Sequence, residues 1–157
     1  MPTREPLIVL VPCLNEARSI GGLVASILGA YPNVLVLDDG SADQTASLAR
    51  EAGALVHSNP HPRGKGNALR QACALALQMG HTHAILMDGD GQHLPQDIPN
   101  LVGRRRAAGA ALVVGNRLAT PSRMPPIRRW TNQAMSRILS AATGQAWPDT
   151  QCGFRAL

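Results

Sequence analysis

The sequence predicts an α/β domain with a mostly parallel sheet flanked by helices. Five short runs, nearly continuous in Val, Ile, Leu and Ala, have the composition of strands buried on both faces of a parallel sheet. Stretches with helical periodicity lie between these runs, and this alternation predicts right-handed βαβ connections. At 157 residues the chain fits one domain. The expected strands are Leu7–Val11, Val34–Leu37, Ala54–Val56, Ala84–Met87 and Ala111–Val114.

The helices are predicted from capping signals and spacing. The capping-box pattern of Ser41–Gln44 predicts the start of the second helix, which should end near Gly53. The third helix is expected over Gly66–Met79. One buried stripe should contain Leu69, Ala72, Ala76 and Met79.

Proline marks the later elements. Pro95 suits a first helical turn, so we expect a helix after His93 that ends near Gly109. Residues 118–126 are proline-rich and loop-like, and Ile127–Thr143 returns to a helical pattern with arginines interleaved.

Composition excludes several classes of protein. With 45% hydrophobic and 16% charged residues, the chain is too apolar to be disordered. Two Trp, one Tyr and one Phe are too few for aromatic platforms that stack single-stranded nucleic acid. No apolar run is long enough to span a bilayer, and the N-terminus lacks a signal-peptide pattern. Three cysteines without a CxxC pair argue against a disulfide scaffold or zinc site and favour a reducing, cytoplasmic compartment.

The net charge of +5 is unevenly distributed. Residues 1–99 carry six basic and nine acidic side chains, whereas residues 100–157 carry nine arginines and the single Asp149. This asymmetry is consistent with one site for a cation and another for phosphate, or with a solvated basic face.

Acidic residues follow directly after the expected strands. The carboxyl ends of parallel strands meet at one edge, so these side chains should converge there, where a cation would offset their repulsion. Asp88 and Asp90 are spaced to reach one divalent ion, which keeps positions open for diphosphate oxygens. An EF-hand loop does not fit, because His93 stands where that loop needs glycine. The converging residues are Glu16, Asp38, Asp39, Asp88 and Asp90.

Arg63–Asn67 is a glycine-containing turn that opens the third expected helix and contains Lys65. It matches neither a dinucleotide fingerprint nor a Walker loop, so it is an anion site at a helix N-terminus or a plain turn. His93 lies beside the expected cation, where it would contact metal-bound phosphate or the acceptor, or serve as a structural loop histidine.

Six motifs occur in the order seen in family 2 glycosyltransferases, and the chain resembles the polyprenyl-phosphate sugar synthase branch, which includes dolichyl-phosphate mannose and glucose synthases. The motifs are Val11–Glu16, Asp38–Thr45, Arg63–Ala68, Asp88–His93, Gly115–Arg117 and Asp149–Arg155.

The resemblance implies a Rossmann-like GT-A fold, a UDP- or GDP-sugar donor, Mg²⁺ or Mn²⁺ and inversion at the anomeric carbon. It implies a nucleotide-sugar-binding half over about residues 1–115 and the start of an acceptor-binding half over about residues 116–157. The nucleotide-binding residues would be Pro12, Asn15, Glu16, Asp38, Asp39, Ser41, Lys65 and Gly89. The metal ligands would be Asp88, Asp90 and Gln92.

On the acceptor side, the resemblance implies a polyprenyl phosphate or another acceptor. The residues that contact it would be His93, Arg117, Arg128, Arg129 and Gln151. Asp149, Asp90 and Arg117 would be catalytic. An acceptor hydroxyl needs a general base, for which Asp149 is the candidate, whereas an anionic lipid phosphate needs Asp149 only for orientation.

The chain stops directly after Gly153–Arg155, whereas relatives continue, so we expect it to be truncated at the C-terminus: a fragment, a minimal variant or half of a split system. We expect a cytoplasmic protein, with possible peripheral contact at the inner face of the cytoplasmic membrane and no nucleic-acid partner. Two alternatives stay open. One is a sugar nucleotidyltransferase, and the other is a non-catalytic module that binds anionic membrane or nucleic acid through Arg104–Arg106 and Arg117–Arg137.

Overall fold

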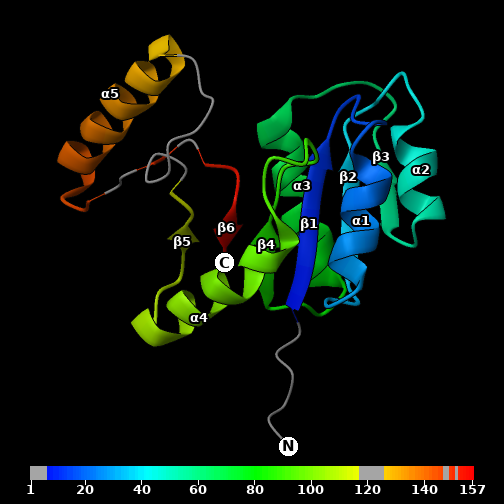
Figure 1. The fold of residues 1–157 in the computed structure, drawn as a ribbon, viewed down its shortest axis with the longest axis horizontal. Helices are drawn as coiled ribbons and strands as arrows, with labels where there is room; N and C mark the ends of the chain where they lie inside the picture. Colours follow the sequence, from blue (N-terminus) through cyan, green and yellow to red (C-terminus); the bar gives the residue numbers. More distant parts are fainter. Residues whose placement is uncertain (1–6, 117–125, 147–148, 151) are drawn as a thin grey trace, which may run out of the picture.

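The computed structural model describes residues 7–116, 126–146, 149–150 and 152–157, with the backbone alone at residues 126–129. These residues form one six-stranded sheet with helices on its two faces, which confirms the predicted fold class (Figure 1). The strands are β1 (Leu7–Cys13), β2 (Val34–Asp38), β3 (Leu55–Ser58), β4 (His83–Leu86), β5 (Val113–Val114) and β6 (Arg155–Ala156). The helices are α1 (Ile20–Leu28), α2 (Thr45–Glu51), α3 (Lys65–Gln78), the 3₁₀ turn η1 (Pro95–Asp97), α4 (Ile98–Ala108) and α5 (Pro126–Thr143).

The sheet order is β3-β2-β1-β4-β6-β5. β1 pairs in parallel with β2 and β4, and β2 pairs in parallel with β3. The sequence did not predict β6, which lies antiparallel between β4 and β5. It is only two residues long, so pairing with its neighbours rather than a local apolar run defines it.

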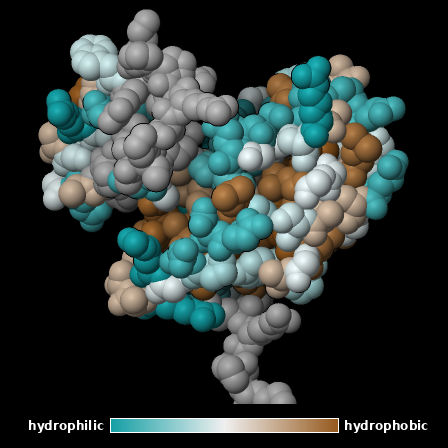
Figure 2. Space-filling view, in the orientation of Figure 1, coloured by the Kyte–Doolittle hydropathy of each residue, from teal (hydrophilic) through white to brown (hydrophobic). Residues whose placement is uncertain are grey.

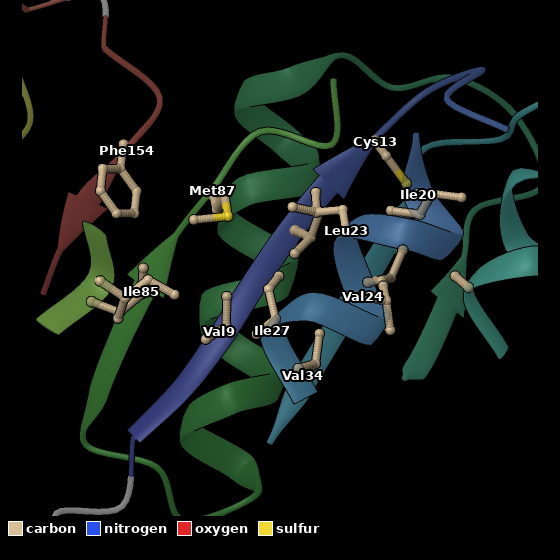
Figure 3. Close-up of a cluster of buried hydrophobic side chains, with 14 of the residues drawn as sticks. Val9, Cys13, Ile20, Leu23, Val24, Ile27, Val34, Ile85, Met87 and Phe154 are labelled. Carbon is tan, nitrogen blue, oxygen red and sulfur yellow. The ribbon is translucent and has the colours of Figure 1, made fainter. Parts of the chain in front are cut away.

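Alternate residues of β1 divide the core into two layers. Val9 and Val11 face α1, whereas Ile8 and Leu10 face α3, and all four are fully buried. Figure 3 shows the α1 layer, in which Ile27 lies over Val9. The two-sided burial explains why these strands have no polar alternation.

The buried stripe predicted for the third helix is confirmed at Ala72 and Ala76 but not at Leu69 and Met79. Ala68, Ala72 and Ala76 are buried against the sheet, while Met79 is 43% exposed and Leu69 is only partly buried. The small alanine side chains allow α3 to approach the sheet closely.

Two local predictions were wrong. α2 begins at Thr45 rather than after a Ser41 cap, because the Ser41 hydroxyl is engaged elsewhere and Asp43 accepts the Thr45 N–H at 3.0 Å. β3 is an edge strand rather than a doubly buried one, and Leu55 is 54% exposed. The predicted end of α4 is confirmed at Gly109, which adopts a positive φ of 57°.

The carboxyl ends of β1, β2 and β4 lie together at the upper edge of the sheet in Figure 1. Figure 2 shows the surface of the molecule in the orientation of Figure 1. Apolar side chains lie in the middle of this view, between hydrophilic ones. None of the described helices combines the length and the hydrophobicity that a membrane crossing requires. Most of the proline-rich stretch expected as a loop, together with Arg117, lies outside the described residues.

Candidate functional site

The acidic residues predicted to converge lie at one edge of the sheet. β1 and β2 end side by side, because Cys13 pairs with Asp38 and the Asp39 N–H donates to the Cys13 carbonyl at 2.9 Å. Burial raises the pKa of the Cys13 thiol to about 12, and the charges of nearby carboxylates add to this increase. Those carboxylates are Asp38, Glu16, Asp43 and Asp39. A thiol with this pKa stays protonated, so Cys13 fills space as expected and is no nucleophile.

The loop after β4 joins the same edge. Lys65, the first residue of α3, pairs its Nζ with Asp88 Oδ1 at 2.7 Å. The Ser19 hydroxyl donates to the Gly89 carbonyl at 2.7 Å. A Cβ at Gly89 would lie 2.9 Å from the Cys13 Cβ, so only glycine allows this close approach. The loops after β1 and β4 are therefore packed directly on each other.

Hydrogen bonds of Asn15 and Ser41 connect the loops after β1 and β2. The Asn15 N–H donates to Ser41 Oγ at 2.8 Å, and the Ala42 N–H donates back to Asn15 Oδ1 at 2.9 Å. Asn15 adopts a positive φ of 56°, which asparagine tolerates better than most residues. The Ser41 N–H also donates to Asp38 Oδ1 at 3.0 Å, so three predicted nucleotide-binding residues form one connected unit.

Asp39 is buried and holds the segment that leads into α3. Its carboxylate accepts the Arg63 N–H at 3.0 Å, the Gly64 N–H at 2.8 Å and the Asn59 side-chain amide at 2.9 Å. Burial alone would raise the pKa of Asp39, but the hydrogen bonds outweigh it and lower this pKa below its ordinary value. Asp39 therefore contributes to the site indirectly, because it holds the turn that precedes Lys65.

Gly40 allows the backbone around His61, in the segment that leads into α3, to pack closely against the turn after β2. A Cβ on Gly40 would stand 2.7 Å from the His61 carbonyl carbon, and its φ of +80° already favours glycine. Asn59 was not singled out from the sequence, although it directly follows β3 and obeys the same rule of polar residues at strand ends.

The residues after Asp88 differ in exposure. Asp90 and Gln92 are exposed, and Asp90 Oδ1 accepts the Gln92 N–H at 3.0 Å. His93 is buried and stacks on Phe154, with ring centroids 5.2 Å apart. This packing supports the structural alternative for His93, and its contact with phosphate or acceptor stays a prediction.

The segment before β6 brings the C-terminal region to the Asp88 carboxylate. A Cβ on Gly153 would overlap that carboxylate, so glycine is required where the two meet. The Arg155 guanidinium donates to the Cys152 carbonyl at 2.9 Å and to the Thr150 carbonyl at 3.1 Å, which fixes the turn. Asp149, at the start of this segment, is 2% exposed.

The remaining predicted site residues are Pro12 and Glu16, which are described, and four residues whose side chains are not. Pro12 is buried within β1, opposite Leu37 of β2, and Glu16 is half-buried at the start of the next loop. Arg117 and Gln151 lie outside the described residues, as do the side chains of Arg128 and Arg129 on α5.

The expected metal ligands provide carboxylate and amide oxygens, which Mg²⁺ and Mn²⁺ accept. Within the described part of the chain, no three acidic, histidine or cysteine side chains form a ready-made cluster. Asp88 already binds the ammonium group of Lys65, so this position favours positive charge. One or two carboxylates fit a divalent ion that takes its remaining ligands from phosphate and water.

Comparison with known proteins identifies relatives along nearly the whole chain. The family model for glycosyl transferase family 2 matches residues 8–156. Glycosyltransferase AglJ of Haloferax volcanii is 33% identical over 161 residues, covering 99% of this chain and 51% of that protein. Polyprenol monophosphomannose synthase of Mycolicibacterium smegmatis is 30% identical, with 99% and 62% covered.

A solved structure extends the similarity to three dimensions. The crystal structure of Mycobacterium tuberculosis glucosyl-3-phosphoglycerate synthase with Mn²⁺ and UDP-glucose superimposes with a TM-score of 0.74 at 27% identity. The match covers 98% of this chain and 56% of that one. This chain thus spans between half and two thirds of the length of these three proteins.

Proposed function

Because the chain belongs to glycosyltransferase family 2 and has the GT-A fold, we propose that it moves a sugar from a UDP- or GDP-sugar to a polyprenyl phosphate, with inversion. The observation that carries the proposal is the meeting of Asp88, Lys65 and Gly153 at one edge. This contact places the segment that contains Asp149 next to the acidic region, which suits a cation and a diphosphate.

The donor binds at the carboxyl edge of β1, β2 and β4. The nucleoside lies against Pro12, Asn15, Glu16, Asp38 and Ser41, and hydrogen bonds already join the segments that carry Asn15, Asp38 and Ser41. Lys65, at the N-terminus of α3, faces the diphosphate, and Gly89 lets it approach the backbone. Asp39 contributes through the turn that positions Lys65.

Asp88, Asp90 and Gln92 hold the divalent cation together with the diphosphate. The Mn²⁺ and UDP-glucose of the mycobacterial synthase structure support a divalent cation in this family, without choosing between Mg²⁺ and Mn²⁺. When bound, such an ion stabilises the negative charge that develops on the leaving diphosphate. Lys65 must then exchange Asp88 for a phosphate oxygen.

The acceptor approaches from the C-terminal half, about residues 116–157. Its oxygen forms the new bond to the anomeric carbon while the bond to the diphosphate breaks, which inverts the anomeric configuration. Arg117, Arg128 and Arg129 neutralise phosphate, and His93 and Gln151 line the acceptor side. Asp149 orients an anionic phosphate acceptor, or takes the proton of a hydroxyl acceptor.

A polyprenyl phosphate is embedded in a bilayer, so the proposal places the protein in the cytoplasm, at the inner face of the cytoplasmic membrane. The similarity to the polyprenol monophosphomannose synthase of Mycolicibacterium smegmatis supports this acceptor class.

The test is transfer of radiolabelled sugar from UDP-glucose, UDP-N-acetylglucosamine or GDP-mannose to undecaprenyl phosphate with Mn²⁺, measured as label extracted into organic solvent. We expect one donor to label the lipid, and the coupling constant of the anomeric proton to report inversion. Asp90→Asn should reduce the rate by about 10²-fold, whereas Glu51→Gln, which removes an exposed carboxylate of α2, should not reduce it. Labelling that is unchanged in EDTA, or equal losses in both variants, would contradict the proposal.

A further inference from the structure

α5 has its polar and apolar faces reversed relative to an ordinary surface helix. Ser136 is 2% exposed, and its hydroxyl oxygen accepts the Thr150 N–H at 3.0 Å. Asn132 and Ser140, on the same side of the helix, are half-buried. The polar side of α5 therefore faces the protein.

The large apolar side chains lie on the other side. We call these four residues, with their exposed fractions, the outer face of α5: Trp130 71%, Met135 46%, Ile138 63% and Leu139 41%. Figure 1 shows α5, in orange, standing apart from the sheet. A surface helix normally turns its apolar stripe toward the core, so this face calls for an apolar partner.

Charge decides which partner fits. α5 contains Arg128, Arg129 and Arg137 and no acidic residue. Across residues 100–148 the sequence has eight arginines and no Asp or Glu. A second copy docked through the same face would bring these arginine-rich helices together without a compensating charge. An anionic lipid surface offers both acyl chains for the apolar residues and negative headgroups for the arginines.

We propose that the outer face of α5 binds the surface of an anionic lipid bilayer, with the helix lying in the interface plane. A tryptophan among aliphatic residues, with arginine beside it, is the composition of interfacial helices. The inference rests on the proposed function in one respect: that function requires contact with a membrane, and the outer face of α5 would be the surface that makes this contact. Its test requires neither donor, metal nor acceptor, so the two can fail separately.

The experiment is flotation of the whole chain with vesicles of phosphatidylcholine alone or phosphatidylcholine mixed with phosphatidylglycerol. We expect binding to the mixed vesicles, weakened by salt, with a blue shift of tryptophan emission. The double variant Trp130→Ser/Ile138→Ser should bind at least about tenfold more weakly. Arg137→Gln should lower binding about fivefold.

Each variant has a control on another element. Leu77→Ser removes an apolar side chain of α3 that is 68% exposed, and Arg70→Gln removes an exposed charge of the same helix. Both should bind vesicles like the unaltered chain, and circular dichroism with thermal melting checks that all variants fold.

Equal binding to neutral and mixed vesicles would overturn the proposal, as would equal losses from the α5 variants and their controls. Light scattering adds a third outcome. A stable dimer that the Trp130→Ser/Ile138→Ser variant dissociates, and that does not bind vesicles, would assign the outer face to a second copy instead.

Discussion

Two polar regions of the molecule are held in contrasting ways. Around Asp39, three donors converge on one buried carboxylate, and the loops after β1, β2 and β3 are cross-linked by side-chain and backbone hydrogen bonds. Around Ser136, the described contacts of α5 with the rest of the chain include a hydroxyl pair with Thr150 and one backbone N–H.

The two halves of the proposed site therefore differ in how far folding alone arranges them. The donor side is fixed by the fold itself, because its residues follow parallel strands whose register sets their positions. The acceptor side depends on a helix whose apolar face points outward. Changes to buried groups of the first region should therefore affect stability most, whereas changes to buried groups of α5 should affect stability less.

The largest expected effect is at Gly40. Gly40→Ala adds a Cβ at 2.7 Å from the His61 backbone at a φ of +80°, so we expect it to lower the free energy of unfolding by about 3 kcal/mol in urea titrations. Gly109→Ala is the matched control, because its φ of +57° is also positive, in the left-handed helical region, but nothing lies within 4 Å of the added Cβ. It should cost about 1 kcal/mol. Equal losses would show that segment 59–64 does not pack on Gly40 as described.

Asp39→Asn should lower the free energy of unfolding by about 2 kcal/mol at neutral pH, because a neutral amide replaces the charged acceptor of buried donors. The folded-state pKa of Asp39 is lowered, so its stabilisation is complete above its ordinary value of 3.8 and is lost as pH falls through the folded-state value. The difference between Asp39→Asn and the unaltered chain should therefore shrink on acidification. A constant difference across this range would refute the role of the charge. Glu51→Gln serves as the control for removing an exposed carboxylate.

Ser136→Ala tests the region around Ser136, where fewer described hydrogen bonds connect α5 to the rest of the chain. It removes the oxygen that accepts the Thr150 N–H, so we expect a loss of about 1 kcal/mol in the free energy of unfolding. Ser47→Ala, which removes an exposed hydroxyl on α2, should cost less. A loss at Ser136 as large as that at Asp39 would erase the contrast between the two regions.

Lys65→Gln should change stability least, by about 0.5 kcal/mol, because its ion pair with Asp88 involves a side chain that is 66% exposed. Lys65→Gln should change ligand binding more than stability, and it should change the affinity for two ligands in opposite directions. A nucleoside diphosphate should bind about tenfold more weakly, while Mn²⁺ alone should bind more tightly, since Lys65 no longer neutralises Asp88. Calorimetric titration measures both, with Arg70→Gln on the exposed side of α3 as the control. A variant that weakens both ligands equally would refute this competition.

Much of the donor side could be predicted from the sequence. The rule that ligands lie at the carboxyl ends of parallel strands is enough to place Glu16, Asp38 and Asp88 at one edge of the sheet. The same rule could have found Asn59. The direction of the Asp39 carboxylate could not be predicted, because it depends on a turn twenty-four residues farther along, at Arg63.

The C-terminal region was harder to predict for physical reasons. β6 has two residues, so only its pairing with β4 and β5 defines it. The sequence pattern predicted a helix over Ile127–Thr143, but it did not predict which side of that helix faces the protein. The placement of Gly153 against Asp88 is also a long-range contact that local patterns do not encode.

Calorimetric titration of UDP and GDP into the chain, with and without Mn²⁺, tests whether the carboxylates after β4 bind a nucleotide through a cation. We expect one nucleotide to bind only when Mn²⁺ is present, and we expect Asp90→Ala to abolish this binding while Glu51→Gln preserves it. Equal binding with and without Mn²⁺, or no binding of either nucleotide to the unaltered chain, would contradict a site in which these carboxylates hold a cation and a diphosphate together.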